Sequence, residues 1–167
     1  MTSDPGGGPG GPGPDGEDRK PTPRPDPPAP EGIEAVRRAL CAEAVEVTAA
    51  SFVALLEPVG SALWTTGADP SELEGVRIPQ WPARFAAARA FARGAAYRLD
   101  DLASVTSPSC PLAQRSGAAC ALYLPVVVGE LTIGVLATGW RMTLPAPLAA
   151  EREGTLAEIA EIAAFSL

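Results

Sequence analysis

Apolar residues recur at steps of three and four in three stretches of the chain, a pattern typical of helices that bury one face. The first stretch predicts a helix over residues 32–50, and the second, rich in alanine, predicts a helix over residues 81–93. Gly94 follows the second helix directly and suits its C-cap. The third stretch begins near Pro147, since proline is tolerated in the first turn of a helix, and continues to Leu167.

Short apolar runs bounded by turn residues predict the strands. Residues 52–57 and 61–66 flank Pro58-Val59-Gly60 and are expected to form a hairpin. A further short strand is expected over residues 95–99. Asp100-Asp101 follows it, and because adjacent residues on a strand point to opposite faces, these two carboxylates do not form a metal or acid–base pair. They are expected to end the strand and start a turn.

The clearest pattern covers residues 119–140, where two nearly all-apolar strands meet at Gly129-Glu130. Glycine first in a two-residue loop suits a type II′ hairpin turn. Alternate residues of the first strand face opposite sides of the sheet, and both sets are apolar. One face carries Cys120, Leu122, Leu124, Val126 and Val128, and the other carries Ala119, Ala121, Tyr123 and Val127. Both faces must be covered, so the hairpin belongs in the middle of a sheet, and the order of elements indicates an α+β fold that is mainly antiparallel.

Composition separates an N-terminal tail, residues 1–31, from a folded domain, residues 32–167. The tail is dominated by proline and glycine and lacks the apolar side chains that could offset its ordering entropy, so we expect it to be disordered. The whole chain carries a net charge of −7, and its arginines are dispersed, which argues against a nucleic-acid-binding surface. No apolar run is long enough to span a membrane, and no signal-peptide pattern begins the chain; a cytoplasmic protein is expected.

The chain contains no histidine, so it lacks the usual ligand of haem and catalytic zinc and the usual general base. Its three cysteines, Cys41, Cys110 and Cys120, form no CxxC motif. Cys41 and Cys120 fall at apolar positions and are interpreted as core residues. Cys110 falls in a polar loop and is the only thiol expected to be exposed. The sequence therefore predicts no metal, no cofactor and no enzyme activity.

Three segments in this order resemble GAF domains. RGAAYRLDDLA (residues 93–103) resembles the G-x-P-x-x-x-x-D-L-A segment of that family, although it lacks the proline. PLAQRSGAACALYLPVVVGELTIGVLATGW (residues 111–140) resembles the two central strands, and SALWTTGADPSELEGVRIP (residues 61–79) resembles the early hairpin strand and its loop. The sequences of these segments are similar to those of sensory GAF domains that precede diguanylate cyclase modules in actinobacterial proteins.

The resemblance implies a central, mainly antiparallel sheet of five or six strands. It places the terminal helices on one face, and on the other face helices and loops that form a pocket. It implies a non-enzymatic sensory or regulatory module that binds a small molecule and relays a signal through its terminal helices to a separate output protein. Leu156, Ile159, Ile162 and Phe165 spread too widely around the last helix for one sheet to cover, so a homodimer through the first and last helices is expected. A dimerisation or protein-interaction scaffold without a ligand is the alternative.

The candidate pocket wall consists of Trp81, Phe85, Arg115 and Cys110. Trp81 and Phe85 lie one turn apart on the expected helix that borders the pocket, and Arg115 is a candidate to meet an anionic ligand, as are Arg77 and Arg84. In bilin-binding relatives a histidine follows the attachment cysteine, but here Pro111 follows Cys110, so bilin attachment is not expected.

Two other family activities have motifs that can be compared with this chain. The cyclic-nucleotide motif is missing, because the chain has no asparagine and only one lysine, Lys20. Free methionine sulfoxide reductases of this fold carry cysteines ahead of the middle helix, whereas residues 76–93 here have none. A redox-sensing role for Cys110 and a reductase-like activity stay open as the less favoured alternatives.

Overall fold

The chain is described by a computed structural model that covers residues 31–105 and 109–167. The helices of this part are α1 (Glu31–Thr48), α2 (Ala86–Arg93), α3 (Pro111–Ser116) and α4 (Ala146–Ala163). The strands are β1 (Phe52–Val59), β2 (Ala62–Asp69), β3 (Arg77–Pro79), β4 (Tyr97–Leu99), β5 (Cys120–Val128) and β6 (Leu131–Trp140). Two short 3-10 helices, η1 (Ser71–Leu73) and η2 (Leu102–Ser104), lie in the connections.

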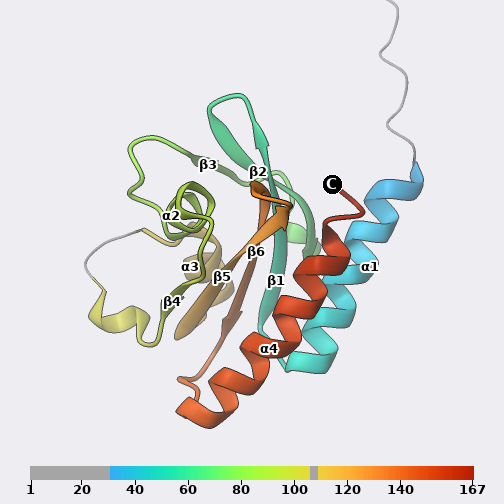
Figure 1. The fold of residues 1–167 in the computed structure, drawn as a ribbon. Helices are drawn as coiled ribbons and strands as arrows, with labels where there is room; N and C mark the ends of the chain where they lie inside the picture. The colour runs from blue at the N-terminus through green and yellow to red at the C-terminus, as the bar shows by residue number, and fades with distance from the viewer. Residues whose placement is uncertain (1–30, 106–108) are drawn as a thin grey trace, which may run out of the picture.

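The six strands form one sheet in the order β3-β2-β1-β6-β5-β4, and every pair of neighbours is antiparallel. Figure 1 shows α1 and α4 side by side on one face of this sheet, with α2 and α3 on the other. We call these the α1/α4 face and the α2/α3 face. The α+β class and the expected mainly antiparallel sheet of five or six strands are confirmed, and the sheet has six strands.

The predicted central hairpin is present as β5 and β6, with β6 paired to β1 in the middle of the sheet. Gly129 opens its turn at φ 63°, a positive value that both types of primed hairpin turn require at this position and that favours glycine. Alternation along β5 divides the interior as expected: Leu122 and Leu124 enter the cluster under α1 and α4, whereas Tyr123 enters the cluster under α2 and α3. Val127 and Val128, near the turn, lie beyond both clusters and are exposed.

Close packing of α1 on the sheet depends on Gly67 in β2. A Cβ atom at this position would lie 2.8 Å from Cβ of Arg37 and 3.1 Å from its carbonyl carbon, so a side chain there would push α1 away. Arg37 in turn ties this helix to two other segments. Its Nη2 lies 2.8 Å from Glu57 Oε1 on β1, and its Nε donates to the Ser166 carbonyl at 2.9 Å. The position of α1 on the sheet therefore depends on the close contact between Gly67 and Arg37 and on the half-buried ion pair between Arg37 and Glu57.

Two predicted elements differ from the structure. The helix expected over residues 81–93 begins only at Ala86, because Phe85 is extended and Pro82 precedes it. Alanine content favours helix, but proline biases the residue before it toward extended backbone. The loop expected between the early hairpin and this helix also contains β3, which pairs with β2 through Ile78 opposite Leu63. Three residues with one buried side chain are too short for a periodic signal.

The last helix, predicted to continue to Leu167, ends at Ala163, whereas two predictions about helix ends and turns hold. Gly94 caps α2 in the left-handed conformation at φ 59°. Asp101 lies in the turn after β4 and caps η2, because its Oδ1 accepts a hydrogen bond from the Ala103 amide at 2.9 Å. The predicted tail, residues 1–31, lies outside the described residues except for Glu31, which begins α1.

Candidate functional site

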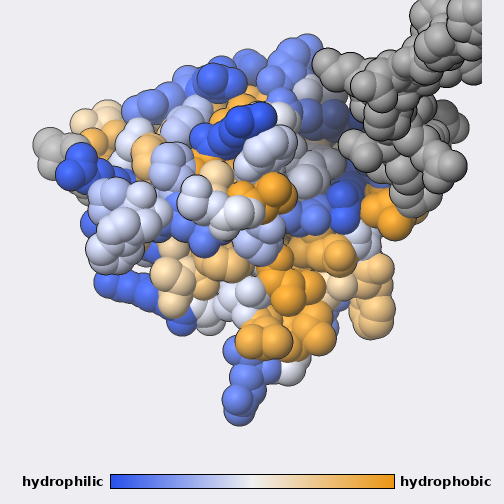
Figure 2. Space-filling model, turned by 90° about the horizontal axis from the view of Figure 1, so that it is seen from above, coloured by the Kyte–Doolittle hydropathy of each residue, from blue (hydrophilic) through white to orange (hydrophobic). Residues whose placement is uncertain are grey.

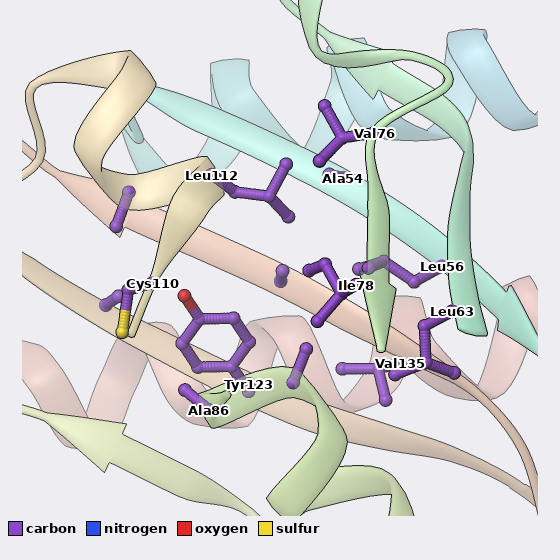
Figure 3. Packing of buried hydrophobic residues seen from close by; sticks show 14 of the residues in the cluster. Ala54, Leu56, Leu63, Val76, Ile78, Ala86, Cys110, Leu112, Tyr123 and Val135 are labelled. Atoms are coloured by element: carbon purple, nitrogen blue, oxygen red, sulfur yellow. The ribbon is translucent and has the colours of Figure 1, made fainter. Parts of the chain in front are cut away.

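The α2/α3 face is the face on which a pocket was expected, and side chains fill it. Figure 3 shows the Tyr123 ring at the centre of this cluster, among residues contributed by α2, α3, β3 and the central strands. Tyr123, Ile78 and Leu112 are completely buried there. Leu73 and Val76, from the segment between β2 and β3, close one side of the cluster.

The structure brings together two of the four candidate wall residues. Cys110 is only 2% exposed and belongs to the buried cluster, against which Phe85 also packs. A short backbone ladder joins their segments: the Ser109 amide donates to the Arg84 carbonyl at 2.9 Å, and Phe85 and Ser109 form an isolated parallel bridge.

Trp81 and Arg115 are placed outside this cluster. Trp81 is 83% exposed, because it precedes α2 instead of lying on it, and Arg115 is exposed in the last turn of α3. Of the other two arginines considered, Arg84 is exposed, and Arg77 stacks its guanidinium 3.8 Å from the centre of the Trp64 ring at the β2–β3 edge. Of the four residues expected to form the pocket wall, Phe85 and Cys110 therefore lie in or against the interior cluster, and Trp81 and Arg115 lie at the surface.

The interior contains one polar contact that the sequence analysis missed. The Tyr123 hydroxyl lies beside the Cys110 thiol, and apart from that thiol no group among the described residues satisfies it. Burial is the main cause that raises the pKa of Tyr123 well above its usual value, and Cys110 adds to it. A buried hydroxyl without a full hydrogen bond costs about 1–3 kcal/mol, so this is a costly position for a tyrosine.

The expectation of an exposed Cys110 is wrong. This residue is the N-cap of α3, whose first helical residue is Pro111, and the helix turns the thiol into the interior. Burial raises the pKa of Cys110, while hydrogen bonds with Tyr123 and with the Ala86 backbone act in the opposite direction. The nucleophilic form of a cysteine is the thiolate, so burial makes this thiol less reactive.

The other two thiols are core residues, as predicted. Cys41 and Cys120 are buried in the cluster under α1 and α4, on the opposite side of the sheet from Cys110. Burial raises the pKa of the Cys41 thiol to about 12 and also raises that of Cys120. The sheet separates Cys110 from the other two, and a disulfide needs Cα atoms within about 7 Å, so the present fold does not bring Cys110 together with a resolving thiol.

Neither a metal site nor a membrane-spanning helix is present in the part of the chain that the structure describes. No group of three or more acidic or thiol side chains there could hold a metal ion. No helix in residues 31–105 or 109–167 has the length and apolar character needed to cross a bilayer.

The α1/α4 face differs from the α2/α3 face because it leaves apolar side chains uncovered. Phe165, just after α4, is 94% exposed, and Ile162, Ile33 and Val36 are also exposed. A groove of about 430 Å³ lies at this end, between the start of α1 and the end of the chain, with Ile33, Val36 and Phe165 in its walls. Figure 2 looks down on this end of the molecule and shows hydrophobic surface gathered there. We call Ile33, Val36, Ile162 and Phe165 the apical patch.

No protein-family model matches the chain, and no curated protein matches it either. Solved structures do match. The type II free methionine-R-sulfoxide reductase of Thermoplasma acidophilum superposes with a TM-score of 0.67 at 16% identity, over 81% of this chain and 92% of that one. The GAF domain of a phosphoenolpyruvate-protein phosphotransferase from Acinetobacter gives 0.65 at 11% identity, over 80% of each chain.

The GAF-B domain of DevS from Mycobacterium smegmatis gives a TM-score of 0.58 at 24% identity, over 80% of this chain and 91% of that one. These TM-scores, at identities below 25%, establish a common fold and leave function open, all the more because a reductase and GAF domains of other proteins share it. The sheet order, the terminal helices on one face and these neighbours together identify the fold of this chain as that of a GAF domain.

Proposed function

We propose that this chain is a non-enzymatic regulatory module that acts through its terminal helices by pairing with a second copy of itself. The observation that carries the proposal is the apical patch, in which two residues of α1, one at the end of α4 and one just after it leave large apolar side chains exposed. Exposed apolar surface that is contiguous on a helix pair is typical of an interaction site.

The geometry of the patch suits a symmetric dimer. In a two-fold dimer the same surface meets itself, so an apolar patch finds an apolar partner without a second complementary site. The surface around the patch is also held in place, because Arg37 bridges β1 and the Ser166 carbonyl beneath it. A change in how α1 packs against α4 would therefore alter the dimer interface, which is the form of relay that the GAF fold suggests for this chain.

The chemistry of the described residues supports the proposal that the chain is not an enzyme. All three thiols are buried, burial raises their pKa values, and Cys110 lies across the sheet from the other two. The chain has no histidine to act as a base. Thiols that are not joined by disulfides fit the cytoplasmic location that we propose.

The test of pairing is the mass in solution, measured by light scattering after size exclusion. We expect a dimer at micromolar concentrations for the full chain, and a monomer for Ile162→Glu combined with Phe165→Glu, since both side chains are exposed and their replacement leaves the core intact. Leu131→Glu, which adds a charge at another exposed apolar site, is the matched control and should stay dimeric. A wild-type monomer at these concentrations, or a double variant that still dimerises, contradicts the proposal.

A second candidate function is small-molecule sensing on the α2/α3 face. The observation in its favour is the Tyr123 hydroxyl, a buried donor that a polar ligand could satisfy, beside Cys110 and near Phe85. Such a ligand would have to displace side chains of the filled cluster, with Trp81 and Arg115 closing over it from the surface. Native mass spectrometry of protein purified from its own host tests this: a retained small molecule whose loss follows Tyr123→Phe supports sensing, and bare protein argues against it.

A further inference from the structure

A second cavity lies at the other end of the helix pair, where the end of α1, the end of β6 and the start of α4 meet. This is the lower end of the molecule in Figure 1. The cavity has a volume of about 480 Å³ and is lined by Trp140, Met142, Leu144, Leu148, Arg141 and Arg152, together with the residues that link α1 to β1. Small-molecule sites usually measure about 300–1,000 Å³, so this volume is sufficient for a ligand. We call it the basal cavity.

The polar groups of the inner wall are already used by the protein. The Trp140 indole donates its Nε1–H to the Thr48 carbonyl at 3.0 Å, the Thr48 hydroxyl donates to the Ala44 carbonyl, and the Ser51 hydroxyl donates to the Gly139 carbonyl at 3.0 Å. The wall therefore presents apolar surface to the cavity: the rings of the nearly buried Trp140 and the partly buried side chains of Leu144 and Leu148.

The charged groups of the cavity are all of one sign. Arg141 and Arg152 are part of its lining, and no carboxylate is. Neither arginine takes part in any of the ion pairs found among residues 31–105 and 109–167. Arg152 uses Nη1 to donate to the Val47 carbonyl at 2.6 Å, which leaves its other N–H groups for a ligand. Guanidinium groups bind carboxylates through short, paired hydrogen bonds.

From this combination we infer that the basal cavity binds a monocarboxylate with an unbranched alkyl chain. The carboxylate meets Arg141 and Arg152, and the chain lies against Trp140, Leu144 and Leu148. A neutral amphiphile would leave the two arginines without an anionic partner, and a small carboxylate without a chain would leave the apolar wall in water.

The position of the cavity connects this ligand to the terminal helices. Trp140 and Arg152 each donate to a carbonyl in the last turn of α1, from β6 and from α4 respectively. A carboxylate bound to the remaining N–H groups of Arg152 would pull on the same guanidinium that holds the Val47 carbonyl. Occupancy of the basal cavity would therefore change how the end of α1 is held against α4, about one helix length from the apical patch.

Calorimetric titration of the full chain with decanoate, below its micelle concentration, tests the inference. We expect one decanoate per chain, with decanol and acetate binding at least about tenfold more weakly, equivalent to about 1.4 kcal/mol. In spectra of ¹⁵N-labelled protein the Trp140 indole signal, assigned with Trp140→Phe, should shift on binding, whereas that of the exposed Trp81 should not.

Charge variants provide the control. Arg141→Gln with Arg152→Gln should weaken decanoate binding by about tenfold or more, because two charged partners are removed. Arg93→Gln, which removes an exposed arginine at the end of α2 on the other face, should leave decanoate binding unchanged. Absence of binding to folded wild-type protein, equal binding of decanol, or unchanged binding by the double variant would each overturn the inference. The mass of the protein in the same samples is measured separately, so that a failure of pairing and a failure of binding remain distinguishable.

Discussion

The two faces of the sheet are covered in different ways. On the α2/α3 face, the short helices α2 and α3, together with η1 and strand β3, close over a cluster. Tyr123, Leu112 and Ile78 are completely buried in it. On the α1/α4 face, two helices of 18 residues each cover another cluster of buried residues but leave a groove at one end and the basal cavity at the other. Irregular segments can follow the contour of a sheet, whereas straight helices on a twisted sheet leave their ends unsupported. Partners and ligands are therefore best sought at the ends of the helix pair.

The largest expected effects test whether both clusters are equally part of the core. Leu112 and Leu156 are both completely buried, one on each face. Leu112→Ala and Leu156→Ala should each lower the free energy of unfolding by about 2–5 kcal/mol, since each leaves a cavity in a packed interior. Denaturant titration measures this, with the exposed Leu131→Ala as the control. A near-neutral Leu112→Ala would mean that the α2/α3 face is loosely packed, and it would favour the sensing function.

A smaller effect tests how closely α1 approaches the sheet. Gly67→Ala places a methyl group against the Arg37 backbone and should cost about 1–3 kcal/mol, because neither backbone can move without repacking. Gly154→Ala, in the interior of α4 with open space around its Cα, is the matched control and should stabilise by about 0.5–1 kcal/mol through helix propensity alone. Thermal unfolding of both variants gives the comparison. If they behave alike, α1 is not held by backbone contact.

Alkaline pH should destabilise the protein through its buried thiols. Burial raises the folded-state pKa of Cys41 from 9.0 to about 12, so its contribution is fully present below pH 9 and is lost as the pH rises toward 12. One pH unit above the ordinary value, the loss from Cys41 is about 1 kcal/mol. Cys41→Ala should flatten this part of the stability profile even though it lowers stability at neutral pH. If the stability of the Cys41→Ala variant falls with pH as steeply as that of the wild type, Cys41 is not the cause of the alkaline destabilisation.

The smallest expected effects compare one buried polar group on each face. Trp140→Phe removes the Nε1–H that the Thr48 carbonyl accepts, and it should lower the stability by about 1 kcal/mol. Tyr123→Phe removes a hydroxyl that is poorly satisfied and should be neutral or stabilising. Calorimetric melting compares the thermal stability of each variant with that of the wild-type protein. Destabilisation by Tyr123→Phe would mean that the hydroxyl has a stronger partner than Cys110.

Periodicity alone determined much of the fold. Alternation along β5 predicted which side chains enter which cluster, and glycine at residues 94 and 129 predicted a helix end and a turn, because these features depend on neighbours in the chain. Cys41 and Cys120 were predicted as core residues for the same reason: each lies on an apolar stripe of a regular element.

Only the tertiary structure decided the candidate sites. Cys110 lies in a polar stretch of sequence, yet α3 turns it onto Tyr123, and that contact depends on how α3 packs on the sheet. Trp81 carries an apolar ring but lies at the surface, since α2 begins at Ala86, five residues after the start that the composition predicts. The basal cavity joins the end of α1 to the first half of α4, and the hydrogen-bonded Val47 and Arg152 beside it are 105 residues apart along the chain. Such a meeting depends on how the helices pack, and no local pattern of residues encodes it.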